Sequence, residues 1–234
     1  MRRVYEGLFH PGEVVEIRAI DVDGPGPWKG RARGTVSGYF NDAVAFAKAA
    51  ADLDAARAKG VYYTLNPCNP ALLARASNRL IANPKNTTQD NDICCLRWLP
   101  IDLDPKRPAG ISATEAELQA AVALGAEIAA WLEGSLGFGR AVRGYSGNGI
   151  HLLYRLADLP NDAEHRDLIK KALAAIGARF SSASVDVDQK TFNPARIWKL
   201  YGTTGRKGDS TADRPHRKSY IYDGQELGLE EGDP

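Results

Sequence analysis

The chain has 234 residues, a formal net charge of +1, 44% hydrophobic residues and 25% charged residues. This composition is typical of a folded globular protein with a sizeable core, and the near-zero charge excludes a global basic field that would attract nucleic acid. No apolar run reaches the roughly 20 residues of a membrane span. No run of signal-peptide length follows the basic start either, so we expect a cytoplasmic protein without a membrane partner.

The three cysteines, Cys68, Cys94 and Cys95, form no CxxC pair. We interpret them as reduced thiols, the usual state in a cytoplasmic protein. A zinc site that joins them to His10 is the alternative. Adjacent residues on a strand point to opposite faces, so Cys94 and Cys95 could hardly bind one ion together, and we expect no zinc.

The first part of the chain predicts strands and helices that are separated by turns rich in glycine and proline. Alternating apolar residues indicate the strands, and an N-cap at Asn41 or Asp42 indicates the start of a long helix. The segments are strands at 13–20, 35–40 and 61–65, a helix at 41–60 and a short helix at 71–81.

The second part alternates strands and helices without the strict period of a doubly wound fold. Its clearest helix, at 112–137, begins with a capping box of Ser112 and Glu115 or of Thr114 and Glu117. The other segments are a helix at 162–180 and strands at 97–104, 149–156, 184–188 and 196–202. We expect an α+β or α/β fold of two lobes, one domain over residues 1–222, and an acidic tail or linker stub at 223–234.

Two Asp-x-Asp pairs stand at the ends of buried strands. Asp102 and Asp104 point to one face of their strand, and Asp186 and Asp188 to one face of theirs. Like charges at this separation repel one another unless a cation lies between them, either a divalent ion or a neighbouring lysine or arginine. Oxygen-only ligands favour magnesium, manganese or calcium over zinc, and two such ions can hold the oxygens of a phosphoryl or nucleotidyl transfer.

A glycine-rich turn between the two pairs leads into a strand that begins at His151. Its glycines allow backbone amides to approach an anion, and His151 lies on the polar face of the strand. A basic segment with Arg196, Lys199, Arg206 and Lys207 follows the second pair. Such cations either neutralise the carboxylates in a salt-bridged surface strand or bind a polyanion, such as a nucleoside triphosphate.

The ordered segments LPIDLDP, SGNGIHLLY and VDQKTFNPARIWKLYGT resemble the three motifs of the archaeo-eukaryotic primase superfamily. They are most similar to the bifunctional primase-polymerase domains of phages, plasmids and other mobile elements, and the resemblance spans most of the chain. It implies an RNA-recognition-like catalytic lobe, a smaller α/β lobe and an active site in the cleft between them. It also implies primer synthesis and DNA extension from NTPs or dNTPs on a single-stranded DNA template, with two Mg²⁺ or Mn²⁺ ions.

The motifs assign a role to individual residues by their position. The resemblance assigns metal binding and catalysis to Asp102, Asp104 and Asp188, with Asp186 as a supporting residue. The residues to which it assigns nucleotide binding are Ser146, Gly147, Asn148, Gly149, His151, Arg196, Lys199 and Lys207. Some relatives have a serine at the position of Gly149, so we expect backbone amides of this turn to contact phosphate in its place.

A template strand needs a basic groove, and several residues outside the motifs could line one. The candidates are Arg75, Asn78, Arg79 and Arg143. An ordinary exposed helix face is the alternative interpretation of the first three. Relatives in mobile elements often continue into a helicase, which is therefore a further expected partner.

Two rival functions stay open at this point. A metal-dependent nuclease would use the same aspartates, because two ions cleave phosphodiesters as readily as they form them. A non-catalytic replication module would bind nucleic acid without turnover. His151, Arg196 and Lys199 favour polymerisation, since a nuclease needs no dedicated grip on a triphosphate.

Overall fold

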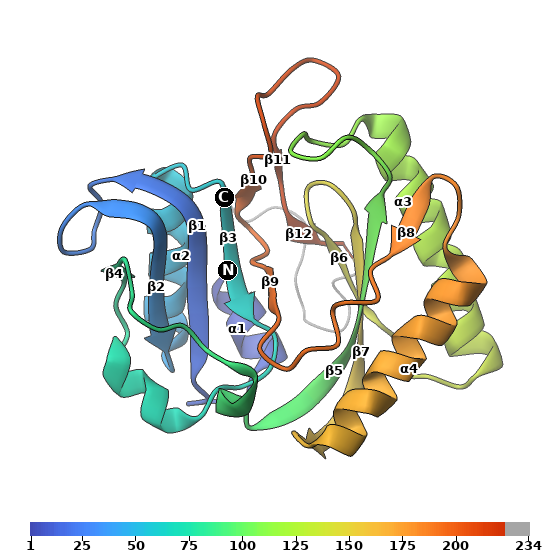
Figure 1. Cartoon of the computed structure of the whole chain (residues 1–234), viewed down its shortest axis with the longest axis horizontal. Helices are drawn as coiled ribbons and strands as arrows, with labels where there is room; N and C mark the ends of the chain where they lie inside the picture. The colour runs from blue at the N-terminus through green and yellow to red at the C-terminus, as the bar shows by residue number, and fades with distance from the viewer. Residues whose placement is uncertain (223–234) are drawn as a thin grey trace.

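The computed structural model describes residues 1–222, in which helices pack on two five-stranded antiparallel sheets and two short strands, β10 (Thr204–Gly205) and β11 (Arg217–Lys218), form a separate pair (Figure 1). The longer strands are β1 (Val15–Gly24), β2 (Ala32–Phe40), β3 (Gly60–Thr64), β5 (Cys95–Pro105), β6 (Val142–Tyr145) and β7 (Ile150–Pro160). The other short strands are β4 (Ile81–Ala82), β8 (Val185–Val187), β9 (Ile197–Lys199) and β12 (Tyr220–Ile221). The helices are α1 (Arg2–Leu8), α2 (Ala43–Ala55), α3 (Glu115–Ala129) and α4 (Ala163–Phe180), with short helical segments η1 (Pro70–Arg75), η2 (Asp90–Asp92) and η3 (Ala130–Ser135).

The first sheet has the strand order β4-β2-β1-β3-β9 and the second has the order β12-β6-β7-β5-β8. All pairings between these named strands are antiparallel, so the predicted α+β class is confirmed. Strand β9 comes from the C-terminal half of the chain but pairs with β3 of the first sheet. The basic third motif therefore crosses from one sheet to the other. The tail predicted at 223–234 lies outside the described residues.

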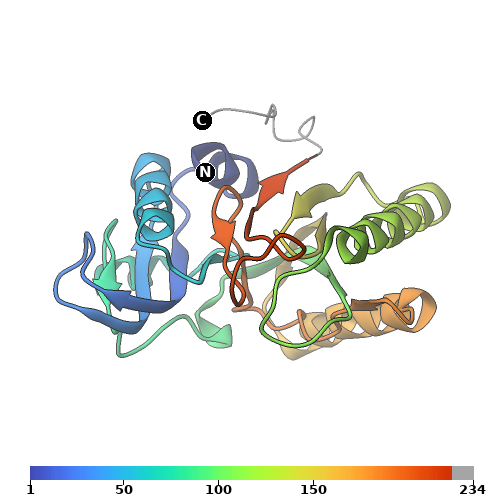
Figure 2. The ribbon, with the colours of Figure 1, turned by 90° about the horizontal axis from the view of Figure 1, so that it is seen from above.

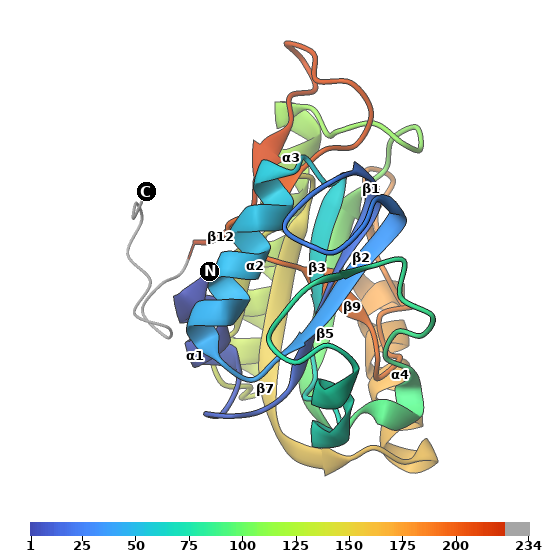
Figure 3. The same cartoon turned by 90° about the vertical axis from the view of Figure 1, so that its left-hand side faces the viewer.

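The first sheet is built by alternation along its central strand. In β1, Ile17 and Ala19 are fully buried in the core that α1 and α2 cover, whereas Glu16 and Arg18 form an ion pair on the opposite face. Figure 3 shows α2 running alongside this sheet. Asp42, one of the two predicted N-cap residues, caps α2 by accepting a hydrogen bond from the next turn.

The second sheet has an apolar core on each face. Leu103 of β5 and Ile150 of β7 pack beneath α3 and α4, which lie side by side in Figure 2. On the other face, Trp98 and Leu153 join the core of the first sheet. Because Asp102 shares this face with Trp98, the polar end of the strand opens toward the first sheet.

Several local predictions differ from the structure. The short helix predicted at 71–81 is only the 3₁₀ turn η1, because the chain after Arg75 bonds to the edge of β2: the N–H of Tyr39 donates to Ala76, and the N–H of Asn78 donates to Tyr39. The capping box forms at Thr114 and Glu117, and α3 continues into the π-helical segment η3. Helix α1 and strand β6 were not predicted. In the described part of the chain, no helix combines the length and apolar character that crossing a membrane requires.

Candidate active site

The two acidic pairs meet at one end of the second sheet. Strand β5 lies between β7 and β8, and its register places Asp102 opposite His151 of β7 and Asp104 opposite Asp186 of β8. Asp188 follows β8 directly, and its backbone N–H donates to the carbonyl oxygen of Asp102 at 2.9 Å. Three carboxylates from two neighbouring strands are thus held side by side, as the alternation predicts.

The three carboxylates have different partners. Arg107 donates to Asp104 at 3.0 Å, and the Asp188 carboxylate accepts the backbone N–H of Lys190 at 2.8 Å. No lysine or arginine of residues 1–222 lies within ion-pair distance of Asp102; its near neighbour is His151, whose Nε2 lies 3.5 Å from Oδ1. Burial and the charges of Asp104 and Asp188 raise the pKa of Asp102 well above the ordinary range of an aspartate. The charges of Lys207 and Arg196 offset this increase only in part, and the carboxylate has no direct ion pair with a lysine or arginine of residues 1–222.

Asp186 differs from the other three in its partner and its exposure. Its carboxylate is 3.0 Å from Lys106 Nζ, and its side chain is 57% exposed. The structural ion pair considered as an alternative to a metal site is therefore present at this aspartate, and a second one joins Arg107 to Asp104.

Two connected hollows meet at the carboxylates. The inner pocket has a volume of about 140 Å³ and the outer cleft about 1050 Å³. Residues that border both hollows are Lys59, Asp102, Asp104, Asp188 and Lys207. The inner pocket is further lined by Tyr62, Ser146, Asn148, His151, Thr191, Arg196, Ile197, Trp198, Lys199 and Gly205. Most of the predicted nucleotide-binding residues therefore lie around one pocket beside the acids.

His151 is buried at the back of the inner pocket. Its Nδ1 lies 2.9 Å from the hydroxyl of Tyr201, and its ring lies 4.2 Å from that of Trp198. Burial lowers the pKa of His151 to about 3, and the nearby Lys199 contributes to the decrease. The imidazole is therefore neutral at physiological pH, with one nitrogen facing the carboxylates.

The glycine turn packs tightly against the acid-bearing strand. A Cβ at Gly149 would lie 2.3 Å from the carbonyl oxygen of Leu103, and Gly147 has a φ of +96°. The hydroxyl of Ser146 accepts the N–H groups of Asn148 and Gly149. These two amides, which we expected to face phosphate, are bonded inside the turn, and the glycines instead permit close approach to β5.

Of the predicted cations, Lys199 and Arg196 line the inner pocket, whereas Arg206 does not. Lys199 is buried, donates to the carbonyl of Thr204 at 3.0 Å and lies 5.8 Å from the ring of Tyr62. Burial lowers the pKa of Lys199 to about 7. Arg196 donates to the carbonyl of Lys190, while its buried Nε has no hydrogen-bond partner within residues 1–222. Arg206 instead points away from the acids, to Asp54 at 2.8 Å.

The candidate template residues are not gathered in one place. Arg75 bonds to the hydroxyl of Tyr39 at 3.1 Å, and Asn78 exchanges hydrogen bonds with Asn41. Arg79 is exposed on the same segment. Arg143 pairs with Glu133, and its cross-strand partner Leu152 faces the core beneath α3 and α4, so it lies on the face opposite to Asp102. Their proposed role stays a prediction.

Sequence reasoning missed residues that the first sheet contributes. Lys59 precedes β3 and borders both hollows, but no motif surrounds it in the sequence. The sequence offered Tyr62 and Tyr201 only among several tyrosines that could face the nucleotide sugar; the first lines the inner pocket, and the hydroxyl of the second bonds to His151. The cross-strand pairing of Tyr62 with Lys199 brings β3 to the site, and pairing between distant segments leaves no local signal.

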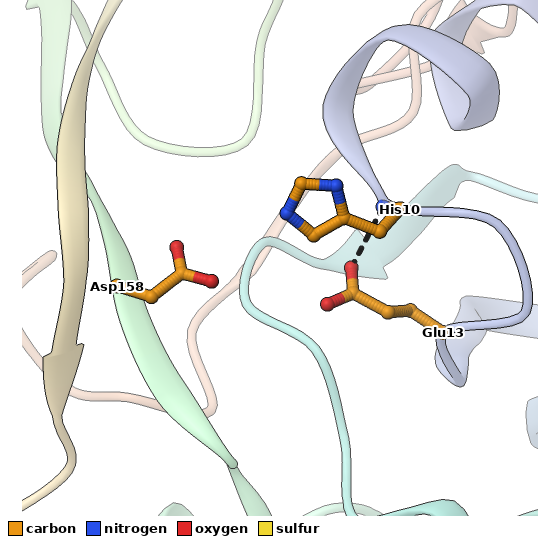
Figure 4. Close-up of side chains that lie close together, drawn as sticks. All are labelled: His10, Glu13 and Asp158. Atoms are coloured by element: carbon orange, nitrogen blue, oxygen red, sulfur yellow. Dashed lines mark hydrogen bonds between the residues drawn. The ribbon is translucent and has the colours of Figure 1, made fainter.

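A second cluster with metal-ligand chemistry lies at the other end of β5 (Figure 4). His10, Glu13 and Asp158 offer ligand atoms within 4.8 Å of one another. The buried guanidinium of Arg97, however, donates to both oxygens of Glu13 and to both oxygens of Asp158. These carboxylates already have a cation, so we interpret the cluster as an ion-pair network.

The three cysteines differ in how far they are buried. Cys68 is buried and lies 3.3 Å from the hydroxyl of Thr64, whereas Cys94 is exposed. Burial raises the pKa of the Cys68 thiol to about 11, so it stays protonated at neutral pH.

Two solved structures are similar to this chain over most of its length. The AEP domain of the primase-polymerase of cyanophage S-2L has 15% identity, a TM-score of 0.49, and a match covering 96% of this chain and 93% of that one. The polymerase domain of Mycobacterium tuberculosis ligase D, solved in complex with DNA, has 18% identity, a TM-score of 0.50, and covers 97% and 84%. No protein-family model matches the chain, and no curated protein matches its sequence. The chain therefore has the fold of the ligase D polymerase domain, in line with the fold that its three motifs predict.

Proposed function

We propose that this protein is a DNA primase-polymerase that transfers nucleotides to a 3′-hydroxyl on a single-stranded DNA template. The observation that carries the proposal is the set of three carboxylates at the junction of the inner pocket and the outer cleft. Within residues 1–222, Asp102 forms no ion pair with a lysine or arginine, which favours a ligand that brings positive charge. The archaeo-eukaryotic primase fold supports this assignment.

The donor set fits divalent magnesium or manganese. Asp102, Asp104 and Asp188 supply carboxylate oxygens only, and hard divalent cations prefer such ligands. When bound, two such ions would lower the pKa of the attacking hydroxyl and neutralise charge on the departing pyrophosphate. Arg107 would keep Asp104 in its present orientation, because it bonds that carboxylate and two carbonyl groups at once.

The inner pocket would bind the triphosphate of the incoming nucleotide. Arg196, Lys199, Lys207 and Lys59 surround it with positive charge, and His151 adds a neutral donor. The unpaired Nε of Arg196 is a buried donor that a phosphate oxygen would satisfy. The low exposure of His151 and Lys199 would exclude water from the phosphates.

The outer cleft would hold the nucleic acid whose 3′-hydroxyl reacts. It is the larger of the two hollows and is lined by Lys106, Arg107, Lys190 and Gln189. Orienting two substrates against one another supplies much of the rate in such transfers. Residues common to both hollows would contact both substrates.

A gel assay with labelled nucleotides tests the proposal. It would use unprimed and primed single-stranded DNA with Mg²⁺ or Mn²⁺, and the Asp102→Ala, Asp104→Ala double variant beside the wild type. Asp167→Ala, on the exposed side of α4, is the matched control. We expect new products with the wild type and the control, and none with the double variant.

Other outcomes would separate the rival functions. Degradation of the DNA that only the double variant abolishes would replace the polymerase by a nuclease. Binding of DNA that needs no metal, together with no synthesis from a supplied primer, would indicate a non-catalytic module.

A further inference from the structure

The side chain of Tyr201 occupies a space that Gly144 leaves open because it has no Cβ. Its side chain is almost fully buried, and a Cβ on Gly144 would lie 2.2 Å from the phenolic oxygen. Gly144 is the cross-strand partner of His151 on β6. Only glycine at this position lets the hydroxyl of Tyr201 reach the imidazole.

The hydroxyl of Tyr201 has two hydrogen-bond partners within residues 1–222. The indole Nε1 of Trp198 lies 3.0 Å away, and Nδ1 of His151 lies 2.9 Å away. An indole N–H can only donate, so the phenolic oxygen accepts from Trp198. The phenolic O–H can then donate only to Nδ1 of His151 among the described residues.

The opposite arrangement leaves a buried donor without an acceptor. If Nδ1 carried a proton, as in the other neutral tautomer or in the imidazolium, it would donate to Tyr201. The phenolic O–H would then have no acceptor among the described residues, and an unsatisfied buried donor is strongly disfavoured.

We propose that Tyr201 and Trp198 are positioning residues that hold His151 in the tautomer with its proton on Nε2. This nitrogen lies 3.5 Å from the carboxylate of Asp102 and borders the inner pocket. His151 therefore presents a neutral N–H donor to that pocket. Resting on the proposed function, we infer that this N–H donates to a phosphate oxygen of the incoming nucleotide.

Nitrogen-15 NMR of histidine-labelled protein tests the tautomer without any substrate. The chain has four histidines, and the signals of His151 are identified by their loss in His151→Gln. We expect the unprotonated nitrogen to be Nδ1, which couples to the ring protons in a pattern different from that of Nε2. A wild-type spectrum with the proton on Nδ1 would overturn the proposal, whatever activity the enzyme has.

Tyr201→Phe removes the hydroxyl and keeps the ring. We expect a mixture of tautomers and a KM for the nucleotide that rises about tenfold, the factor that one hydrogen bond is worth. The affinity for Mn²⁺ should stay unchanged, because the carboxylates are not altered. Tyr5→Phe, which removes a hydroxyl bonded to the carbonyl of Glu13 in the core of the first sheet, is the matched control.

The combined outcomes are distinct. An unchanged tautomer in Tyr201→Phe would show that Tyr201 does not position His151. A changed tautomer with an unchanged KM would contradict donation to the nucleotide but not the primase-polymerase function. If Tyr201→Phe does not fold, Trp198→Phe replaces it: loss of this donor should weaken the tautomer preference, and an unchanged preference would remove Trp198 from the proposal.

Discussion

A charged cluster lies at each end of strand β5, and the two clusters differ in whether every carboxylate pairs directly with an arginine or lysine. At the start of the strand, the guanidinium of Arg97 is 2% exposed and is bonded to Glu13 and Asp158. At its end, Asp102 is 29% exposed and lies beside other carboxylates and the neutral imidazole of His151. Both carboxylates of the first cluster bond directly to a guanidinium, whereas Asp102 bonds to no lysine or arginine of residues 1–222.

This difference separates a structural network from a ligand site. A buried ion pair costs desolvation, which good geometry and full hydrogen bonding must offset. Arg97 meets this condition with four bonds to two carboxylates. Asp102 does not meet it among residues 1–222, and its raised pKa reflects a disfavoured negative charge, which a proton or a bound cation neutralises.

The largest expected effect is on catalysis. Asp102→Asn keeps the shape of the side chain and removes its charge, so nucleotidyl transfer should fall about a thousandfold, the factor that several kcal/mol of charge stabilisation is worth. Thermal melting without metal should show no loss of stability, because the substitution removes repulsion from Asp104 and Asp188. If Asp102→Asn unfolds instead, Asp102 belongs to a structural network and not to a ligand site.

Arg97→Met should have the reverse effect. It leaves Glu13 and Asp158 without their buried partner, and we expect the free energy of unfolding to fall by about 3 kcal/mol. Denaturant titration measures this fall, while activity per folded molecule stays the same. The control is Arg155→Met, which removes an exposed partner of Asp158 and should change stability by less than about 1 kcal/mol. Equal effects of the two variants would refute the role of burial.

Mn²⁺ distinguishes the two clusters directly. At a concentration of about 100 times its Kd, the ion should stabilise the wild type by about 2.7 kcal/mol. The rise in Tm should disappear in Asp102→Asn and remain in Glu13→Gln. If Glu13→Gln abolished it instead, the metal would bind at the cluster around Arg97.

The smallest effect is on the pH dependence of stability. Hydrogen bonding to Arg97 holds the pKa of Asp158 well below its usual range. Its contribution to stability is present above the unfolded-state pKa of about 4 and is lost as the pH falls toward the folded-state value. Because the side chain is 37% exposed, we expect less than about 1 kcal/mol between wild type and Asp158→Asn at pH 6. This difference should shrink below pH 4, and a constant difference would contradict the mechanism.

The sequence by itself determined the faces of the acid-bearing strands. Because side chains alternate along a strand, Asp102 and Asp104 had to point away from Leu103, and His151 away from Ile150; the structure has both arrangements. The three motifs also predicted the fold, which the similarity to the ligase D polymerase domain confirms. These inferences depend on local periodicity and on residues close together in the chain.

Only the tertiary structure decided which distant residues complete each cluster. Lys59 and Tyr62 reach the site because β9 pairs with β3, and Asp158 neutralises Arg97 across 61 positions. Likewise, η1 ends at Arg75 because the residues that follow form backbone hydrogen bonds with the edge of β2. Local patterns specify which face a residue occupies, but the partner on that face depends on long-range strand pairing and on the burial of both cores.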